Sequence, residues 1–315
     1  MTKIYLPQHT KIKLGGGNRF VDNLKKSLKP FDYQFVNDGE DYDILFVAGA
    51  TLCEKEIFRQ AKEKGKTIIL RVDNILEDGK NRNTGMQRLK EYANGADVII
   101  YQTEWAKKIL QPIIGNGVVI VNGVDTDIFY PIEKKEKSNN IRVFYSKFSR
   151  NEVKQFHEVI YWWREYCLEK QGDTLVLVGK FADDKIKIDH PFEFHNMEDY
   201  EYHGIITDEN KIADILRSCD VALLPYMFDA CSNSILEAQA CGLPVIYSPT
   251  GGTPEIIVNG LAIDYRFKTP KEMVEEVAGT DMFNFEAFKN SFGLETMGEK
   301  YHALIQTIKG KQYEV

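Results

Sequence analysis

Short apolar runs alternate with amphipathic segments along the whole chain. Each run is followed by a glycine or a polar break and then by apolar residues three and four positions apart, which is the pattern of βαβ units with parallel strands. The predicted strands of the first half are 4–6, 33–36, 44–47, 67–70, 98–101 and 118–121. Those of the second half are 141–145, 174–178, 221–224, 244–247 and 261–263. The pattern therefore predicts an α/β fold with two Rossmann-like, doubly wound sheets.

Amphipathic helices are predicted between these strands. Phe20, Val21, Leu24 and Leu28 line one face of a helix over residues 18–29. In the second half, Ser149 and Glu152 have the spacing of a capping box, which predicts a helix over residues 150–168.

The two halves are separated by a turn and a charged stretch. Asn122-Gly123 marks the turn, and residues 131–140 hold five charged side chains with little to bury. We therefore expect an N-terminal domain over 1–135, a C-terminal domain over 136–295, and a last helix over 296–315 that packs back on the N-domain. Two such domains facing one another would enclose a cleft at the carboxyl ends of their strands, where these folds bind ligands.

Composition narrows the class of protein. The chain has 315 residues, 43% of them hydrophobic, and lacks the run of about 20 apolar residues that spans a bilayer. The net charge of −7 argues against a nucleic-acid binder. The start lacks the features of a signal peptide, so we expect a cytoplasmic protein. Five cysteines without Cys-x-x-Cys spacing indicate reduced thiols rather than disulfides or a zinc site.

The most informative segment is 225–257. Glu237 is the single charged residue between Ala230 and Pro254, on a predicted helix capped by Ser232 or Asn233. A carboxylate in such surroundings needs hydrogen-bond donors, which the hydroxyls of a bound sugar or ribose would supply. The alternative is a structural pair with a backbone amide or a lysine.

The same segment predicts an anion site. A strand that ends near Leu224 and a helix that begins near Ser232 would point the N–H groups of Cys231–Ser234 at a phosphate. Gly251 and Gly252 lie in a second loop, where the lack of side chains would let a ligand approach the backbone. The alternative for this Gly-Gly pair is a plain turn.

These motifs resemble a known family. Asp229-x7-Glu237, followed by AxACGLPV and GGxPE, resembles the donor-site signature, usually written E-x7-E, of the retaining GT-B glycosyltransferases of family four, the group 1 glycosyltransferases. Supporting segments are 121–131 with its Asn-Gly-Val-Asp, 143–154 with its strand and basic loop, and 175–179 with its terminal Val-Gly.

The resemblance implies roles for single residues. Glu237 would accept hydrogen bonds from the nucleotide ribose, and Asp229 would hold hydroxyls of the donor sugar. Asp229 stands where Glu is usual, which bears on the sugar preference rather than on the reaction class. Lys154 matches the diphosphate-binding lysine, and Arg150 or Lys147 would supply a second cation. For Lys147 alone, a solvated surface position is the favoured interpretation.

In the N-terminal half the resemblance points to Gly16, Gly17 and Asp73. The glycines lie in a Gly-rich turn that would face the diphosphate and the acceptor; Phe20 breaks the dinucleotide fingerprint that the turn otherwise suggests. Asp73 follows the carboxyl end of a strand, where many relatives carry a His or Asp near the reacting carbon. It would orient or deprotonate the acceptor. The alternative is a turn-forming Asp before Asn74.

Several other acidic residues are interpreted as structural. Asp43, Asp97 and Asp220 each precede a strand, and Asp183-Asp184 lies in a polar surface loop. No metal site is expected.

The sequence thus predicts a glycosyltransferase that moves a sugar from a UDP- or GDP-linked donor to an acceptor hydroxyl with retention, in the synthesis of a glycan, polysaccharide or glycolipid, without a metal or other cofactor. The alternative is a sugar-nucleotide-binding protein without turnover, or a related epimerase.

Residues 1–30 hold seven Lys or Arg and one Asp. This excess admits two hypotheses, which are peripheral contact with anionic lipid that carries a lipid-linked acceptor and attraction of an anionic soluble acceptor. The simpler alternative is ordinary solvation of a helix by Lys25, Lys26 and Lys29.

Overall fold

The computed structural model describes residues 1–7, 16–73, 82–133, 140–147, 152–180, 199–264, 266–278 and 283–312. The chain forms two compact units: unit 1 is Met1–Val124 with Asn290–Val315, and unit 2 is Asp125–Lys289. The divisions expected at 135 and 295 differ from these. Val124 donates its N–H to the carbonyl of Phe292 at 2.8 Å and forms a parallel bridge with Gly293, so both crossing segments are tied to unit 1.

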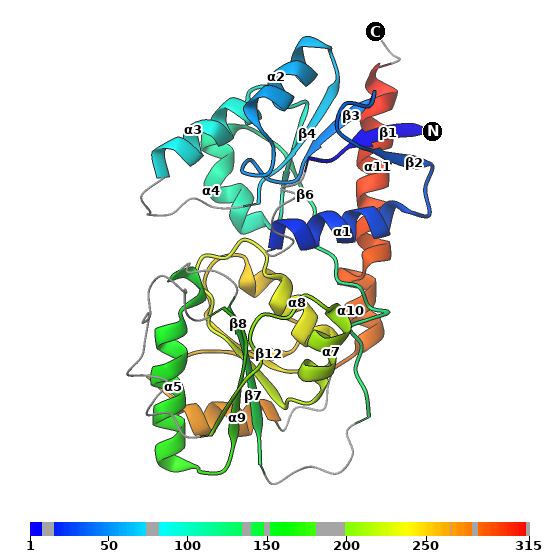
Figure 1. The fold of residues 1–315 in the computed structure, drawn as a ribbon. Helices are drawn as coiled ribbons and strands as arrows, with labels where there is room; N and C mark the ends of the chain where they lie inside the picture. The colour runs from blue at the N-terminus through cyan, green and yellow to red at the C-terminus, as the bar shows by residue number, and fades with distance from the viewer. Residues whose placement is uncertain are drawn as a thin grey trace. The chain divides into compact units, whose positions relative to one another are not determined.

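Unit 1 contains a six-stranded parallel sheet with the order β2-β1-β3-β4-β5-β6 (Figure 1). Its strands are β1 Thr2–Tyr5, β2 Tyr33–Val36, β3 Ile44–Val47, β4 Thr67–Arg71, β5 Val98–Tyr101 and β6 Val118–Val119. Its helices are α1 Gly16–Leu28, α2 Lys55–Glu63, α3 Arg82–Ala93, α4 Glu104–Ile114 and α11 Leu294–Gln312.

The core of unit 1 joins the two ends of the chain. The apolar face of α1 with Phe20 and Leu24 packs against α11, and Tyr301 and Ile305 of α11 belong to the same buried cluster as Ile4 of β1. The aromatic rings of Phe20 and Tyr301 lie 6.1 Å apart. A helix from the last residues of the chain therefore completes the layer over the first strands.

Unit 2 contains a second six-stranded parallel sheet, with the order β12-β11-β10-β7-β8-β9. Its strands are β7 Arg142–Lys147, β8 Thr174–Gly179, β9 Tyr200–Tyr202, β10 Val221–Leu224, β11 Val245–Tyr247 and β12 Gly260–Ala262. Its helical segments are η1 Glu152–Lys154, α5 Phe156–Glu169, α7 Glu209–Arg217, α8 Asn233–Ala240, η2 Thr253–Glu255 and α9 Pro270–Ala278; α10 Phe285–Phe292 crosses into unit 1. Helix α5 packs on α9, and α7 packs on α8.

The predicted strands are present in both units, and β9 is an additional strand that was not predicted. Its residues are exposed or half-buried at the edge of the sheet, so no apolar run marks it in the sequence.

The three carboxylates that precede strands each accept a backbone hydrogen bond from the neighbouring strand. Asp43 accepts the N–H of Lys3 at 2.8 Å, Asp97 accepts the N–H of Ile68 at 2.7 Å, and Asp220 accepts the N–H of Arg142 at 2.9 Å. Their predicted structural role is confirmed.

All five cysteines lie in the described part of the chain, and none forms a disulfide. Among the described residues, no helix is both long enough and apolar enough to cross a bilayer.

Candidate functional site

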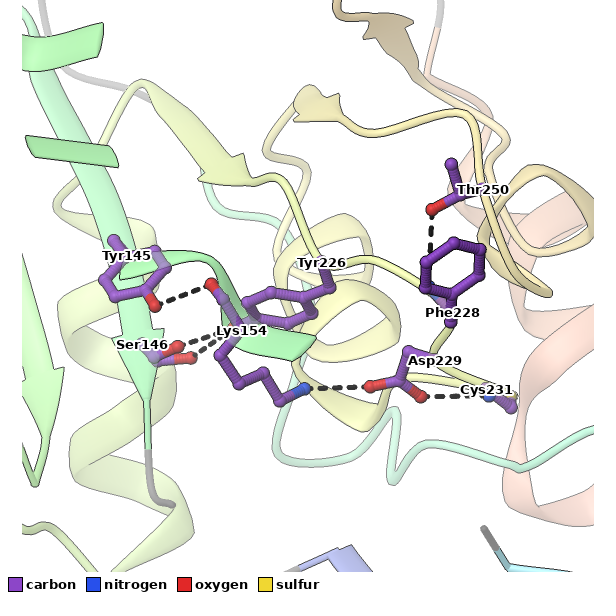
Figure 2. A network of polar contacts seen from close by, with 8 residues as sticks. All are labelled: Tyr145, Ser146, Lys154, Tyr226, Phe228, Asp229, Cys231 and Thr250. Carbon is purple, nitrogen blue, oxygen red and sulfur yellow. Dashed lines mark hydrogen bonds and ion pairs between the residues drawn. The ribbon is translucent and has the colours of Figure 1, made fainter. Parts of the chain in front are cut away.

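Polar side chains gather in unit 2 where β7 and β10 end (Figure 2). These strands are neighbours in the parallel sheet, so their carboxyl ends lie at the same edge. Lys147 is the last residue of β7, and the segment after Leu224 of β10 leads through Asp229 into α8. The fold therefore brings Lys147, Lys154 and Asp229 to one edge of this sheet.

Lys154 and Asp229 form an ion pair. The distance from Lys154 Nζ to Asp229 Oδ2 is 2.9 Å, and the two side chains are 21% and 20% exposed. The ammonium also lies 3.6 Å from the centre of the Tyr226 ring, a cation–π distance. Burial acts to lower the pKa of Lys154, but the Asp229 carboxylate and Tyr226 outweigh it, and the pKa is raised. Lys154 is thus a fixed cation at neutral pH.

Two tertiary hydrogen bonds hold the backbone beside this pair. The Tyr145 hydroxyl donates to the carbonyl of Lys154 at 2.8 Å, and the N–H of Met227 donates to the carbonyl of Val153 at 2.9 Å. The short helical turn that carries Lys154 is thereby attached both to β7 and to the segment that follows β10.

The same bonds explain why the helix predicted over 150–168 is wrong at its start. Because the carbonyls of Val153 and Lys154 are bound elsewhere, they do not begin an α-helix; residues 152–154 form a 3₁₀ turn, Gln155 has φ 51°, and α5 begins at Phe156. Ser149 and Arg150 lie outside the described residues. Lys154 therefore belongs to a turn before the helix rather than to the helix itself.

Lys147 is buried, not solvated as the sequence interpretation favoured. It is 8% exposed because β7 lies between β10 and β8 in the sheet, and its Nζ is 5.4 Å from the centre of the Phe156 ring. On the adjacent strand, a Cβ on Gly179 would lie only 1.9 Å from the Lys147 carbonyl oxygen, so this pairing requires glycine. The structure thus places Lys147 at the end of β7 as a buried cation.

Tyr226 is a site residue that sequence reasoning missed. Its hydroxyl donates to the carbonyl of Ser146 at 2.6 Å and lies 3.1 Å from the Ser146 Oγ, which fixes the ring beneath Lys154. Burial raises the pKa of Tyr226 even though the Lys154 cation lowers it, so the phenol is neutral. A tyrosine that follows a fully buried strand after one proline is the sequence signal that could have identified it.

The N-terminus of α8 adds further polar groups. Ser232 is its N-cap, as predicted, but the Ser232 hydroxyl makes no capping bond; it is buried, and no partner for it lies among the described residues. The N–H of Cys231 donates to the second carboxylate oxygen of Asp229 at 3.1 Å. Glu237, on the same helix as Asn233, is 9% exposed and close enough to act electrostatically on Lys154.

The predicted glycine loop packs against Asp229. Gly251 has φ +68°, and a Cβ there would lie 2.6 Å from the Asp229 carbonyl oxygen, which itself accepts the N–H of Gly252 at 2.8 Å. Phe228 has φ 55° and donates its N–H to the Thr250 hydroxyl at 3.3 Å. The space above Gly251 is thus taken by the chain's own backbone, and the backbone position of Asp229 is fixed.

In unit 1, Asp73 follows β4, as predicted. The backbone N–H groups of Asp73 itself and of Ala50 lie close enough to its carboxylate to favour the charged form. Burial raises the pKa of Asp73, and Arg71 and the two amides lower it by less. Gly16 and Gly17, which were predicted to lie in a turn before the helix, are instead the first two residues of α1, and a Cβ on Gly17 would lie 2.9 Å from Leu52.

Arg71, the last residue of β4, is 2% exposed. Its guanidinium donates to the Ala48 carbonyl at 3.0 Å, to Gln102 Oε1 at 2.6 Å and to Asn122 Oδ1 at 2.7 Å. It also stacks on Phe20, 3.7 Å from the ring centre. This buried cation connects three strand ends with the Asn-Gly turn.

Within the described ranges, no three His, Cys, Asp or Glu side chains gather as a metal-binding cluster. Asp183 and Asp184 lie outside those ranges.

The chain resembles known proteins in part of its sequence and in its fold. Residues 139–279 match the family model for glycosyl transferases group 1. A relative in Campylobacter jejuni, N,N'-diacetylbacillosaminyl-diphospho-undecaprenol alpha-1,3-N-acetylgalactosaminyltransferase, is 29% identical over 127 residues. The matched segment covers 40% of this chain and spans only 31% of the length of that enzyme.

Solved structures resemble the whole chain. Sucrose-phosphate synthase from Thermosynechococcus elongatus superposes with a TM-score of 0.78 at 13% identity over 99% of this chain and 100% of that one. Anabaena Alr3699/HepE in complex with UDP-glucose superposes with a TM-score of 0.75 at 14% identity over 98% of this chain and 100% of that one. Residues 139–279 therefore resemble the group 1 glycosyltransferases, and the two sheets of the chain have the GT-B type of α/β fold.

Proposed function

We propose that this protein transfers a sugar from a nucleoside diphosphate sugar to an acceptor hydroxyl. The observation that carries the proposal is the group formed by Lys147, Lys154, Asp229 and Glu237 at one edge of the unit 2 sheet, beside the N-terminus of α8. Two cations and two carboxylates suit the two parts of such a donor, an anionic diphosphate and hydroxyl-rich sugars. A structural neighbour solved with UDP-glucose supports the same donor class.

In this proposal the cations act on the leaving group. Negative charge develops on the diphosphate as the bond from its oxygen to the sugar C1 breaks, and Lys147, Lys154 and the N–H groups of α8 stabilise it. The acceptor oxygen forms the new bond to C1, and its proton passes either to the leaving phosphate or to a carboxylate that acts as base. Asp229 holds sugar hydroxyls, and Glu237 holds the ribose. Retention of configuration is proposed from the family resemblance.

Asp73 is proposed as the group of unit 1 that orients or deprotonates the acceptor. It follows the carboxyl end of β4, and its raised pKa suits a proton acceptor better than that of an exposed aspartate. Independence of metal ions remains part of the proposal, and transfer that persists in excess chelator would support it.

The experiment that tests the function has two steps. A thermal-shift screen with UDP, GDP, UDP-glucose and GDP-mannose identifies the donor, because a ligand of the folded state raises the melting temperature. Transfer is then measured on a panel of glycan and lipid-linked acceptors with the donor that binds. Donor binding without any glycoside product would favour a binding protein without turnover, and recovery of an epimerised donor would favour the epimerase alternative.

We propose further that the acceptor is lipid-linked and that α1 contacts the lipid surface. Lys26 and Lys29 are exposed, and the name of the Campylobacter relative includes diphospho-undecaprenol. Basic residues near anionic lipid are worth about 1 kcal/mol each. Salt-sensitive co-sedimentation with anionic vesicles, lost when lysines 25, 26 and 29 are changed to glutamine, is expected. Absence of co-sedimentation at low salt would exclude this contact.

A further inference from the structure

We propose that the ion pair between Lys154 and Asp229 makes the site discriminate against free nucleoside diphosphate in favour of the sugar-bearing donor. The inference rests on the proposed function and assigns to Asp229 a second role beside contact with the sugar. It concerns the relative affinity of one site for the donor and for the free nucleoside diphosphate, which is the product that remains after transfer.

Both partners of the pair are already engaged without ligand. Asp229 accepts from Lys154 through one oxygen at 2.9 Å and from the Cys231 N–H through the other at 3.1 Å. Lys154 lies over the Tyr226 ring and is only 21% exposed. A diphosphate that binds Lys154 must therefore share or replace the carboxylate.

Asp229 is not free to move away when a diphosphate binds Lys154. Its carbonyl accepts the N–H of Gly252, and Gly251 approaches its backbone so closely that no Cβ fits. The preceding residue, Phe228, is held with a positive φ by Thr250. Because the backbone is fixed and the side chain is short, the carboxylate remains near Lys154 when the diphosphate arrives.

The two ligands differ in what they offer to Asp229. Free nucleoside diphosphate takes the lysine and places its own negative charge beside a carboxylate that has lost its cation. The donor brings sugar hydroxyls as well, which donate to that carboxylate and replace the lost partner. The carboxylate therefore weakens binding of the product more than binding of the donor, which limits product inhibition.

Titration calorimetry on the full chain tests this with UDP, GDP, UDP-glucose and GDP-mannose as probes. The quantity of interest is the Kd of the free nucleoside diphosphate divided by the Kd of the corresponding sugar nucleotide. In Asp229→Asn the amide still accepts from Cys231 but no longer competes for Lys154. We expect about fivefold tighter binding of the diphosphate, from the usual worth of a partly exposed pair, and weaker binding of the sugar nucleotide, so the ratio falls.

Asp214→Asn is the matched control, because Asp214 pairs with Arg217 at 2.6 Å but is 71% exposed on α7. It should leave both Kd values within about twofold of the wild type. If the Asn protein melts early, Asp229→Ser removes the same charge and retains an acceptor for the Cys231 N–H.

The outcomes separate this inference from the proposed function. A wild-type protein that binds none of the four probes overturns both. Sugar nucleotides that bind the wild type, with a ratio that is unchanged in the Asp229 variants or with weaker diphosphate binding in them, overturn the discrimination alone and leave the donor class intact.

Discussion

The carboxylate of Asp73 lies directly against Gly49: a Cβ on Gly49 would be 2.2 Å from Asp73 Oδ2. The turn after β3 thus leaves room for the carboxylate only because residue 49 has no side chain. Gly49→Ala is expected to displace Asp73 and to reduce the transfer rate at least about tenfold, the scale of a lost acid–base contact. Donor binding, which we assign to unit 2, should be unchanged in calorimetry.

Gly310→Ala is the control for that variant. Gly310 lies near the end of α11 with no atom within 4 Å of its would-be Cβ. Alanine there should stabilise the helix by up to about 1 kcal/mol without an effect on transfer. A Gly49→Ala protein with the wild-type rate would remove Asp73 from the mechanism.

Asp73 should also make stability depend on pH. Its pKa is raised in the folded protein above the ordinary 3.8, so the folded state binds the proton more tightly than the unfolded chain does. Stability is therefore lost as the pH rises through the interval between those two values. Asp73→Asn abolishes this loss, and its melting temperature relative to the wild type should be higher at about pH 7.5 than at about pH 4.5. The opposite trend would contradict the assigned shift.

Gly251→Ala should destabilise unit 2 and weaken donor binding. The new Cβ would meet the backbone of Asp229 at 2.6 Å and 2.9 Å, and φ at this position is +68°. Gly39→Ala separates the cost of the positive φ from the cost of the contact with Asp229, since Gly39 has φ +85° and open space around it. Denaturant unfolding should give a cost of about 1 kcal/mol for Gly39→Ala and more than about 2 kcal/mol for Gly251→Ala. Equal costs would mean that the contact with Asp229 is relieved easily.

Glu237→Gln should weaken nucleotide binding. If the buried carboxylate accepts from the ribose, its loss should raise the Kd of UDP or GDP at least about tenfold, the usual scale for a hydrogen bond to a charged group. Glu276→Gln is the control, because Glu276 is an exposed carboxylate on α9 that pairs with Lys268. Unchanged nucleotide affinity in Glu237→Gln would assign Glu237 to the alternative structural role.

The fold was largely predictable because a parallel sheet buries both faces. Strands β3, β5 and β10 have the predicted bounds, since each is a short apolar run between polar breaks. The start of α5 was not predictable, because the carbonyls of Val153 and Lys154 accept hydrogen bonds from residues distant in the sequence. Local capping signals carry no information about such contacts.

The residues of the candidate site were named from the sequence, but the contacts between them were not. Spacing and resemblance identified Lys154, Asp229 and Glu237, yet nothing in the sequence indicates that Lys154 and Asp229 bind each other. Lys147 was misjudged for a related reason: a lysine is usually exposed, and only the strand order covers this one.

The discontinuity of unit 1 sets the order in which the chain can fold during synthesis. Its core needs Tyr301 and Ile305 of α11 beside Phe20 of α1, whereas unit 2 is a single continuous stretch. Phe20 and its neighbours on α1 leave the ribosome before residues 125–289 are made, and during that time the apolar face of α1 has no α11 to pack against. The unit that synthesis begins first is therefore the one that folding completes last.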